Sequence, residues 1–382
     1  MLALYARSFG VSQWAIGLAI AIYGLARFVV AIPAGQLADR AGRRAGLALG
    51  GLVTGCGNLL CAWAPTYPVF IAGRFVAGAG AALVLITGTV ILADITTPAD
   101  RGRTMAIYQG VFLFAVGVGP MPGGILAERF GLVAPFLVYA VAGVVAGALA
   151  WLAIPETHRA DVDAAEIATQ LPAFGRQIRL LTTHAGFVLV SLISFVTAFA
   201  RTGALFNVIP VLAADRLGLR AEQIGVGLGL ASVVGLVLIY PSGMLVDRYG
   251  RKVVIVPATV VSGVSLVLFL VMPGYAWFLA GCVVWSVATG VSGAAPAAYA
   301  ADTAPPGMNA AAMSAYRMLA DLGYVVGPLA LGLISDGFGA EAALATATVL
   351  LVAAAALFAW RAPELVGAPR WPPHPPRSGR PG

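Results

Sequence analysis

Long, uninterrupted apolar segments are the feature that most restricts what this chain can fold into. Each is roughly 18 to 25 residues long, the length that an α-helix needs to cross the hydrocarbon core of a bilayer. The segments lack the alternation of barrel strands and are too long for them. The sequence therefore predicts an all-α integral membrane protein with eleven spans, near residues 14–34, 45–64, 68–93, 104–126, 133–154, 185–213, 222–243, 253–272, 275–300, 311–334 and 340–360.

Composition excludes most other classes of protein. Only 10% of the residues are charged and 60% are hydrophobic, whereas a soluble domain carries about 25% charged residues. The net charge of +7 does not indicate nucleic-acid binding, because the basic residues stand singly or in small groups between apolar segments. Cysteines and histidines form no ligand set, so we expect no metal and no cofactor. No catalytic Ser/His/Asp set or carboxylate pair is present, which argues against an enzyme.

Polar segments divide the chain. An interval at 155–184 separates an N-terminal half, 1–154, from a C-terminal half, 185–361, and a Pro-rich tail follows at 362–382. We expect the tail to be disordered. Most Arg and Lys residues fall on the side that carries the segment 34–44, so the positive-inside rule places that side, the linker and the tail in the cytoplasm. The chain is therefore expected in the cytoplasmic membrane.

The two halves are copies of one unit. The segment AGQLADRAGRR at 34–44 nearly recurs as SGMLVDRYGRK at 242–252, and Asp39 and Asp247 are 208 positions apart. Such duplication is typical of secondary transporters. The same ungapped offset aligns Gly10 with Gly218, Gly17 with Gly225, Pro33 with Pro241, Phe70 with Phe278, Asp94 with Asp302, Gly119-Pro120 with Gly327-Pro328, and Gly131 with Gly339.

The offset leaves one span of the second half without a counterpart. Residues 185–208 would align with positions before Met1. A complete version would have six plus six spans, so we expect the first span to be missing because the recorded start is late. A natural or cloned eleven-span variant is the alternative.

The repeated segments GQLADRAGRRAGL and GMLVDRYGRKVVI resemble the loop signature of the major facilitator superfamily, and within it the drug:proton antiporter group. The resemblance implies two pseudo-symmetric six-helix bundles around a midplane site. It also implies a conformational latch in which Asp39 meets a helix N-terminus of the other half and helps to hold the outward-open state. The latch residues would be Gly35, Asp39, Arg40, Gly42, Arg43 and Asp94, with Gly243, Asp247, Arg248, Gly250 and Arg251 as the weaker second-half counterpart.

Two further motifs strengthen the resemblance. GRFVAGAGAAL is similar to the family's fourth-span signature, which implies proton coupling by Arg74. GPMPGG, with Gly119, Pro120, Gly123 and Gly124, resembles the fifth-span signature associated with antiport, although Ala115 stands where that pattern has Gly. A kinked and tightly packed helix with no influence on transport direction is the other interpretation of GPMPGG.

Several charged residues fall inside predicted spans. Each of Arg27, Arg74, Arg201, Arg317 and Asp321 would cost at least a few kcal/mol at mid-membrane unless it is paired or hydrated, so a functional cavity is the default explanation. Arg317 and Asp321 are four residues apart on one helix face and close enough to pair. A proton-coupling site and a static ion pair both fit these two residues, and for Arg27 we expect a structural role.

Polar and aromatic side chains within the spans are candidates for a substrate cavity, with lipid-facing packing as the alternative for each. The candidates are Tyr23, Tyr108, Gln109, Arg201, Asn207, Tyr299 and Tyr316, with Phe199, Phe206 and Trp285 as apolar wall.

These features together predict a monomeric secondary transporter that works by alternating access in a lipid bilayer. The resemblance implies proton-driven export of a small hydrophobic drug or metabolite, with the proton gradient as energy source. A nutrient or metabolite symporter is the alternative. From another class, a non-transporting sensor or an inactive N-terminally truncated fragment also fits the sequence.

Overall fold

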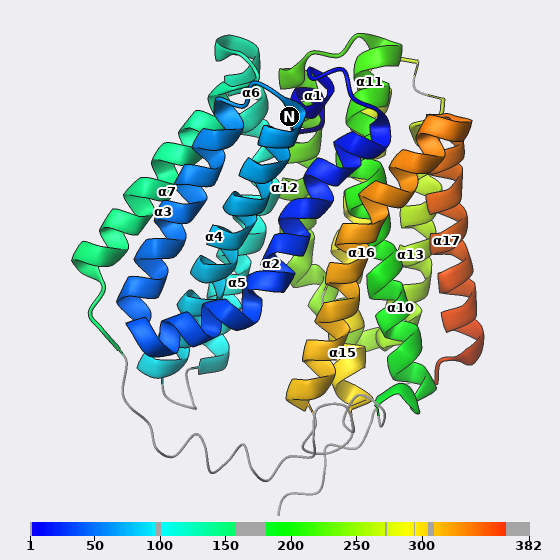
Figure 1. Cartoon of the computed structure of the whole chain (residues 1–382). Helices are drawn as coiled ribbons and strands as arrows, with labels where there is room; N and C mark the ends of the chain where they lie inside the picture. Colours follow the sequence, from blue (N-terminus) through cyan, green and yellow to red (C-terminus); the bar gives the residue numbers. More distant parts are fainter. Residues whose placement is uncertain are drawn as a thin grey trace, which may run out of the picture.

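The computed structural model describes residues 2–96, 101–157, 181–271, 273–293, 295–304 and 309–363. These residues form two helical bundles that stand side by side (Figure 1). The first contains α1 (Leu2–Arg7), α2 (Gln13–Ala41), α3 (Arg43–Ala62), α4 (Tyr67–Ile95), α5 (Arg101–Val118), α6 (Pro120–Phe130) and α7 (Ala134–Ala153). The second contains α10 (Ala185–Ala200), the π-helical segment η1 (Arg201–Val208), α11 (Ile209–Leu217), α12 (Ala221–Tyr249), α13 (Arg251–Leu268), α14 (Tyr275–Ser292), α15 (Ala295–Asp302), α16 (Asn309–Phe338) and α17 (Ala340–Arg361).

The predicted spans are present as helices. Within the described residues, ten helical stretches are long and apolar enough to cross a membrane, and they match ten of the predicted spans. The remaining one, near 104–126, is divided into α5 and α6 at Gly119. Pro120 and Pro122 lack the N–H groups that would continue the hydrogen-bond ladder of α5. Because α5 then stands alone with its polar first turn, its 18 residues are too polar to count as a span, although they are as many as in Arg251–Leu268, which does.

The 208-residue repeat is present in the backbone. Gly42, which ends α2, has φ 94° and ψ 156°, and its counterpart Gly250, which ends α12, has φ 90° and ψ 162°. Such positive φ values are open to glycine and strained for other residues. The segment 34–44 differs from our expectation of a loop, since residues 34–41 continue α2 and the turn is confined to Gly42.

The repeat also extends to side-chain contacts. Tyr67 at the start of α4 donates a hydrogen bond from its hydroxyl to the carbonyl oxygen of Ala15. Its counterpart Tyr275 at the start of α14 donates to the carbonyl oxygen of Gln223 at 3.3 Å. The first bond joins α4 to α2 and the second joins α14 to α12, at equivalent positions of the repeat, so the two halves share packing as well as sequence.

The first span of the second half is irregular. It runs through α10, η1 and α11 over Ala185–Leu217, and its middle is π-helical rather than α-helical. π-helical turns are rare and are frequently found at functional sites. The sequence pattern predicted a plain span here, because nothing in apolar periodicity distinguishes the two kinds of turn.

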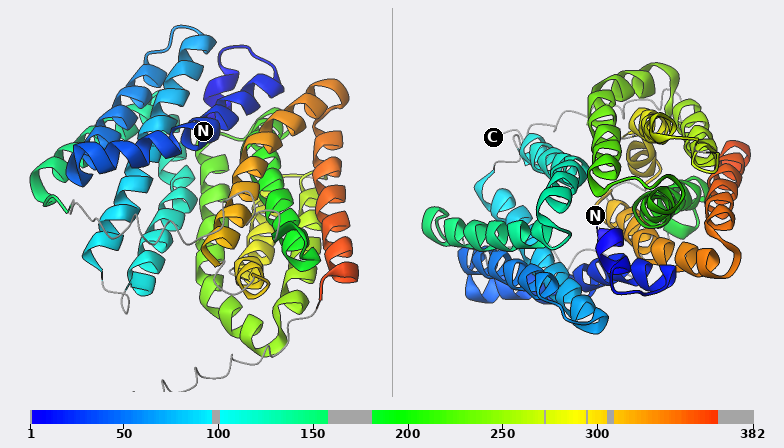
Figure 2. Two further views of the ribbon diagram at one scale, coloured as in Figure 1. Left: turned by 60° about the horizontal axis from the view of Figure 1, so that its bottom comes forward. Right: turned by 90° about the horizontal axis from the view of Figure 1, so that it is seen from above.

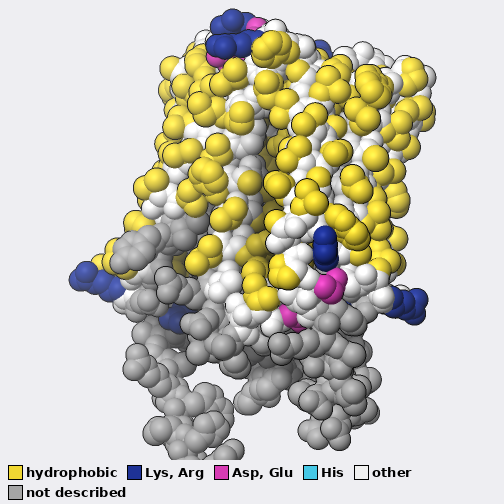
Figure 3. Space-filling view, turned by 90° about the vertical axis from the view of Figure 1, so that its left-hand side faces the viewer, with side chains coloured by type: hydrophobic (Ala, Val, Ile, Leu, Met, Phe, Trp, Pro, Cys, Tyr) yellow, Lys and Arg dark blue, Asp and Glu magenta, His cyan; other side chains and the backbone are white. Residues whose placement is uncertain are grey.

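The outer surface of the bundles suits a bilayer. Hydrophobic side chains cover the middle of the face shown in Figure 3, while Arg, Lys, Asp and Glu gather toward its two ends. Many of the exposed large hydrophobic side chains belong to α7, among them Val141, Leu149 and Leu152. Such a surface is stable against lipid tails and would be unstable in water.

Candidate transport site between the two halves

Two helix crossings join the bundles, and the repeat relates them to each other. α2 packs against α16, and α6 packs against α12 (Figure 2). At the first crossing the backbone of Gly17 lies so close to the carbonyl of Pro328 that no Cβ would fit. At the second, a Cβ on Gly225 would lie 2.5 Å from the carbonyl oxygen of Pro120. Because each residue of one contact is 208 positions from its counterpart, the crossings form a two-fold repeated contact, which we name the seal.

The GPMPGG motif forms one side of the seal. A Cβ on Gly124 would lie 2.8 Å from the carbonyl oxygen of Ala221, and its counterpart Gly332 would meet Cα of Trp14 at 2.7 Å. Gly123 is buried beside Gly124, whereas Gly119 is the single residue between the end of α5 and the start of α6. The interpretation of this motif as a tightly packed helix therefore has a physical basis, since small residues let membrane helices approach closely.

Carboxylates reinforce each crossing. Asp336, near the end of α16, accepts hydrogen bonds at 2.8 Å from the backbone N–H groups of both Gln13 and Trp14, at the N-terminus of α2. Its repeat counterpart Glu128, on α6, lies 3.9 Å from Arg220 at the N-terminus of α12. Sequence reasoning did not single out these two acids. Because they are 208 positions apart, the repeat places an acid at the same position of both halves, and this signal could have identified them.

The π-helical segment is held against this seal by polar contacts. The amide of Asn207 donates to the carbonyl oxygen of Pro328 at 3.0 Å and accepts from the amide of Gln13 at 2.9 Å. The Thr202 hydroxyl lies 3.2 Å from the carbonyl oxygen of Tyr324. Pro328 has no N–H to give to that carbonyl, which would otherwise be its partner in α16. The single Thr202 hydroxyl proton is shared between this carbonyl and that of Ala198, at 2.8 Å, so Thr202 partly satisfies a backbone group that the proline leaves open.

Three of the predicted intramembrane arginines lie near two tyrosines. The guanidinium carbon of Arg74 is 4.5 Å from the ring centroid of Tyr23, and its Nε donates to the carbonyl oxygen of Ala19 at 3.0 Å. The guanidinium carbon of Arg27 is 5.7 Å from the same ring and 5.4 Å from that of Tyr324.

Arg201 belongs to the same group. Its guanidinium carbon lies 5.8 Å from the Phe206 ring centroid, and the next residue, Thr202, lies 3.2 Å from the carbonyl oxygen of Tyr324. We name Tyr23, Arg27, Arg74, Arg201 and Tyr324 the arginine–tyrosine cluster. It draws on α2, α4, η1 and α16, and thus on both halves. We expected a structural role for Arg27, and that expectation stays a prediction. Arg27 lies between the rings of Tyr23 and Tyr324, in the middle of this cluster.

The other predicted cavity residues are dispersed. Tyr299 is fully buried in the core of the second half, in an edge-to-face contact with Phe358 at a centroid distance of 5.1 Å, so it belongs to that core and not to the site. Tyr316 is half-buried against the same core. Tyr108 lies beside Gly88 within the first half. The side chain of Gln109 lies outside the described residues.

The predicted pair of Arg317 and Asp321 is not formed. Both residues lie on α16, but among the described residues no ion pair joins them within 4.0 Å. Arg317 is exposed and Asp321 is half-buried, one turn from Tyr324. A static ion pair between these two side chains is therefore absent, and Asp321 is left close to the arginine–tyrosine cluster along the helix.

The signature segments lie at the opposite end of the bundles from the seal. Arg43 Nε lies 3.3 Å from Asp94 Oδ2, and the repeat counterpart Arg251 Nε lies 3.0 Å from Asp302 Oδ2. The second-half pair thus has the same geometry as the first. Glu156 had not been predicted, and it accepts hydrogen bonds from the backbone N–H groups of Arg43, at 2.8 Å, and the following residue at the start of α3.

Other latch residues lie around these pairs. Gly35 and the exposed Arg40 belong to the last turns of α2, and Arg248 packs on Tyr249 at 5.3 Å. The side chains of Asp39 and Asp247, and the surroundings of Gly243, lie outside the described residues, so the role of Asp39 in the latch stays a prediction.

The halves make contact at one end and diverge at the other. Among the described residues, the hydrogen bonds and ion pairs that join the halves all lie near the seal, including the pair of Arg7 and Asp215. The ion pairs at the signature end join residues of the same half, and Figure 1 shows the bundles separating toward that end. In the part of the chain that the structure describes, the bonds between the halves thus gather at the seal, and the bundles lie farther apart toward the signature segments (Figure 1).

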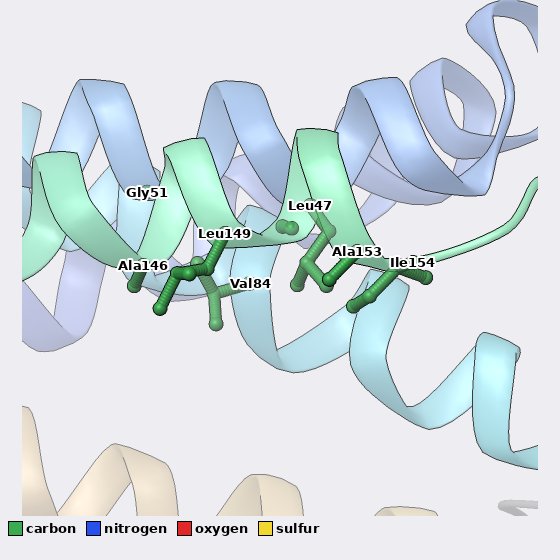
Figure 4. A pocket seen from close by; sticks show the side chains of 8 residues that line it. Leu47, Gly51, Val84, Ala146, Leu149, Ala153 and Ile154 are labelled. Carbon is green, nitrogen blue, oxygen red and sulfur yellow. The ribbon is translucent and has the colours of Figure 1, made fainter.

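A groove elsewhere on the molecule carries no recognition group. It lies on the first half between α3, α4 and α7, and Leu47, Gly51, Val84 and Leu149 are among its lining residues (Figure 4). Its side chains are all apolar, so it offers nothing that would orient a polar substrate.

Comparison with known proteins agrees with the fold and the site. The family model of the Major Facilitator Superfamily matches residues 1–219 and again residues 190–381. The chain therefore belongs to the major facilitator superfamily, a family of membrane transporters, and it resembles the drug:proton antiporter group within it. It is a multi-pass membrane protein whose surroundings are the lipid bilayer and whose cargo is a small molecule.

Individual relatives are distant. An uncharacterized MFS-type transporter of Methanocaldococcus jannaschii is 22% identical over 343 residues, which cover 89% of this chain and 86% of the relative. The multidrug resistance protein MdtL of Shewanella oneidensis is 24% identical over 65% of this chain and 61% of its own length. The inner membrane transport protein YajR of Escherichia coli is 30% identical over 51% of this chain and 43% of its own. The latter two matches span less than two thirds of those proteins.

Solved structures share the fold. The D-xylose-proton symporter has a TM-score of 0.74 at 16% identity, covering 94% of this chain and 91% of that one. A bacterial homologue of the human lysosomal transporter Spinster, in an inward-facing and occupied conformation, has a TM-score of 0.72 at 16% identity, covering 94% and 92%. The two-bundle architecture predicted from the sequence is confirmed.

Proposed function

We propose that this chain exports a small, largely hydrophobic molecule across the cytoplasmic membrane in exchange for protons. The observation that carries the proposal is the seal, a two-fold repeated contact that closes one end of the interface while the signature end is less joined. Two similar bundles joined by two equivalent crossings have a second arrangement available, in which the seal opens and the signature end closes. That exchange is alternating access.

The positions of the motifs support export with a proton. GPMPGG, the motif that resembles the antiporter signature, forms the seal rather than an outer face of the molecule. Several relatives carry the name multidrug resistance protein, MdtL among them. The positive-inside distribution of Arg and Lys places the signature end in the cytoplasm, so a molecule would enter from the cytoplasm in the arrangement described here.

In this proposal Asp321 carries the proton and Arg74 responds to it. Asp321 is half-buried in a span and lies one helical turn from Tyr324, whose ring contacts Arg27. A carboxylate inside a membrane protein is costly while it is charged, so gain and loss of a proton changes the relative stability of the two arrangements. No cofactor takes part, and the protein acts as a monomer with the proton gradient as its energy source.

The test is substrate-driven proton movement in proteoliposomes that contain the full chain and a trapped pH dye. A panel of neutral, anionic and cationic fluorescent compounds is added, and dye and compound signals are recorded together. Asp321→Asn is expected to abolish compound-dependent proton movement, and Arg74→Gln to reduce it strongly. Glu341→Gln, which removes an exposed acid at the seal end, serves as the matched control and should keep the wild-type rate. A folded wild-type protein that moves no proton with any compound would contradict the proposal.

A further inference from the structure

The arginine–tyrosine cluster has an excess of positive charge for its position. Arg27 comes from α2, Arg74 from α4 and Arg201 from η1, and each is half-buried within a predicted span. The distances to the rings of Tyr23 and Tyr324 place the Arg27 and Arg74 guanidinium groups between 4.5 and 5.7 Å from an aromatic centre. Three cations from three helices thus gather in one place at the interface of the halves.

Among the described residues, no carboxylate lies within 4.0 Å of these three guanidinium groups. The five ion pairs of the described residues lie at the two ends of the bundles. Asp321 is three residues from Tyr324 on α16 and is thus the acid nearest in sequence to a member of the cluster. Arg317 on the same helix adds another positive charge. Even if Asp321 is ionised, the charged side chains of this region sum to a positive value.

The guanidinium groups of this cluster also have few hydrogen-bond acceptors within the part of the chain that the structure describes. Arg74 has one donor placed, on the carbonyl oxygen of Ala19. Nε of Arg27 is enclosed by protein and has no hydrogen-bond partner. Buried polar groups are nearly always paired, so an unpaired one needs an explanation such as an unfilled ligand position. Contacts with aromatic faces offset about 1–2 kcal/mol per cation, which is less than the cost of an uncompensated charge in a membrane.

We propose that the arginine–tyrosine cluster binds an anionic group of the transported molecule, of the carboxylate or sulfonate class, attached to an aromatic or aliphatic body. Guanidinium groups bind such oxyanions through two parallel hydrogen bonds, and the unpartnered Nε of Arg27 is one donor available for such a pair. Tyr23, Tyr324 and Phe206 supply the apolar faces against which the body of the molecule packs. This inference rests on the proposed function and narrows its substrate class.

The rigid surroundings favour a binding site over a mobile charge cluster. Arg201 begins the π-helical segment, which Thr202 and Asn207 hold against α16. Tyr324 packs on Gly24 so closely that a Cβ there would lie 2.8 Å from its ring. Because the backbone that carries Arg201 is held at both ends of its segment, only the side chain has to be ordered when an anion binds, which raises affinity.

The test is equilibrium binding of two matched probes to the full chain in nanodiscs. The probes are 2-naphthalenesulfonate and trimethyl(2-naphthyl)ammonium, which share one aromatic body and differ in the sign of a permanent charge. The sulfonate is expected to bind at least about tenfold more tightly, as one charge-assisted contact implies. Arg27→Gln and Arg201→Gln should each weaken sulfonate binding by about tenfold, and Arg27→Lys by less. Arg216→Gln, at the exposed pair with Glu341, is the control and should leave binding unchanged.

The outcomes separate this inference from the proposed function. Equal affinity for the probes, preference for the ammonium compound, or no binding of either overturns the anion site, whatever the proton measurements show. Folded Arg27 and Arg201 variants that keep full sulfonate affinity overturn it as well. Sulfonate preference without proton movement in proteoliposomes leaves the site standing and removes proton-coupled export. The wild-type comparison needs no variant, so it decides the question even if both substitutions prevent folding.

Discussion

Replacing Asp336 by Asn should open the seal in a measurable fraction of molecules. The carboxylate accepts hydrogen bonds at 2.8 Å from two backbone N–H groups in the first turn of α2, across the interface of the halves. An amide keeps one acceptor oxygen and loses the charge that favours a helix N-terminus. An N-terminal cap contributes about 0.5–2 kcal/mol to helix stability, and a favourable charge at the helix dipole contributes about 0.3–1 kcal/mol. Because Asp336 is exposed to solvent, we take about 1 kcal/mol for the whole change.

A change of about 1 kcal/mol corresponds to about a fivefold change in the ratio of open to sealed molecules. The ratio can be read from distance distributions between spin labels at Phe130 and Phe338, which are 73% and 81% exposed at the ends of α6 and α16. These positions are related by the repeat and lie at the seal end of opposite halves. The measurement is made at a pH where the wild type populates both distances.

Glu341→Gln is the matched control for this prediction. Glu341 lies at the same end of the molecule, but its partner Arg216, at 2.5 Å, belongs to the same half. Removing that charge should therefore leave the label distances unchanged. If Asp336→Asn leaves the open fraction at the wild-type value, or if the control shifts it equally, the carboxylate does not stabilise the seal.

Two further substitutions test the packing around the site. Gly225→Ala should also favour the open arrangement, by about 1–3 kcal/mol, because its Cβ would lie 2.5 Å from a backbone oxygen across the seal. Gly337→Ala, with nothing within 4 Å of the added Cβ, should not favour it, as the same label distances would report. Thr202→Val should lower the free energy of unfolding by about 1 kcal/mol, because the hydroxyl that bonds to the carbonyl oxygens of Ala198 and Tyr324 is lost. The loss should be smaller in a Pro328→Ala background, where α16 can satisfy the Tyr324 carbonyl itself, and equal losses in both backgrounds would refute this explanation.

The sequence predicted the fold well because both of its signals are strong in a membrane protein. A bilayer requires long apolar helices, so hydropathy alone located the spans from α2 to α17. The ungapped repeat then predicted equivalent contacts in the two halves. Gly42 and Gly250 have nearly the same backbone angles, and Arg43–Asp94 has its counterpart in Arg251–Asp302.

The arrangement of the site was less predictable. Tyr299 was a reasonable cavity candidate by type and position in a span, but which helix face meets the core depends on the packing of α15 against α10 and α17. Spacing alone placed Arg317 and Asp321 in contact, whereas in the described part of the chain Arg317 is exposed, Asp321 is half-buried and no ion pair joins them. Asp336 and Glu156 lie at helix ends where apolar periodicity carries no information, and their roles depend on a neighbouring helix N-terminus far away in the sequence.

The central claim is alternating access by two moving halves. Its most direct test is to measure the distances between spin labels at both ends of the same protein. One pair of spin labels at Phe130 and Phe338 reports the seal end, and a second at Leu152 and Trp360, 78% and 75% exposed and also related by the repeat, reports the signature end. Proton and probe concentrations are varied in proteoliposomes. We predict two populations in which the seal-end distance lengthens as the signature-end distance shortens, in the same proportion under every condition. A seal-end distance that never lengthens, or ends that change independently, would contradict the account.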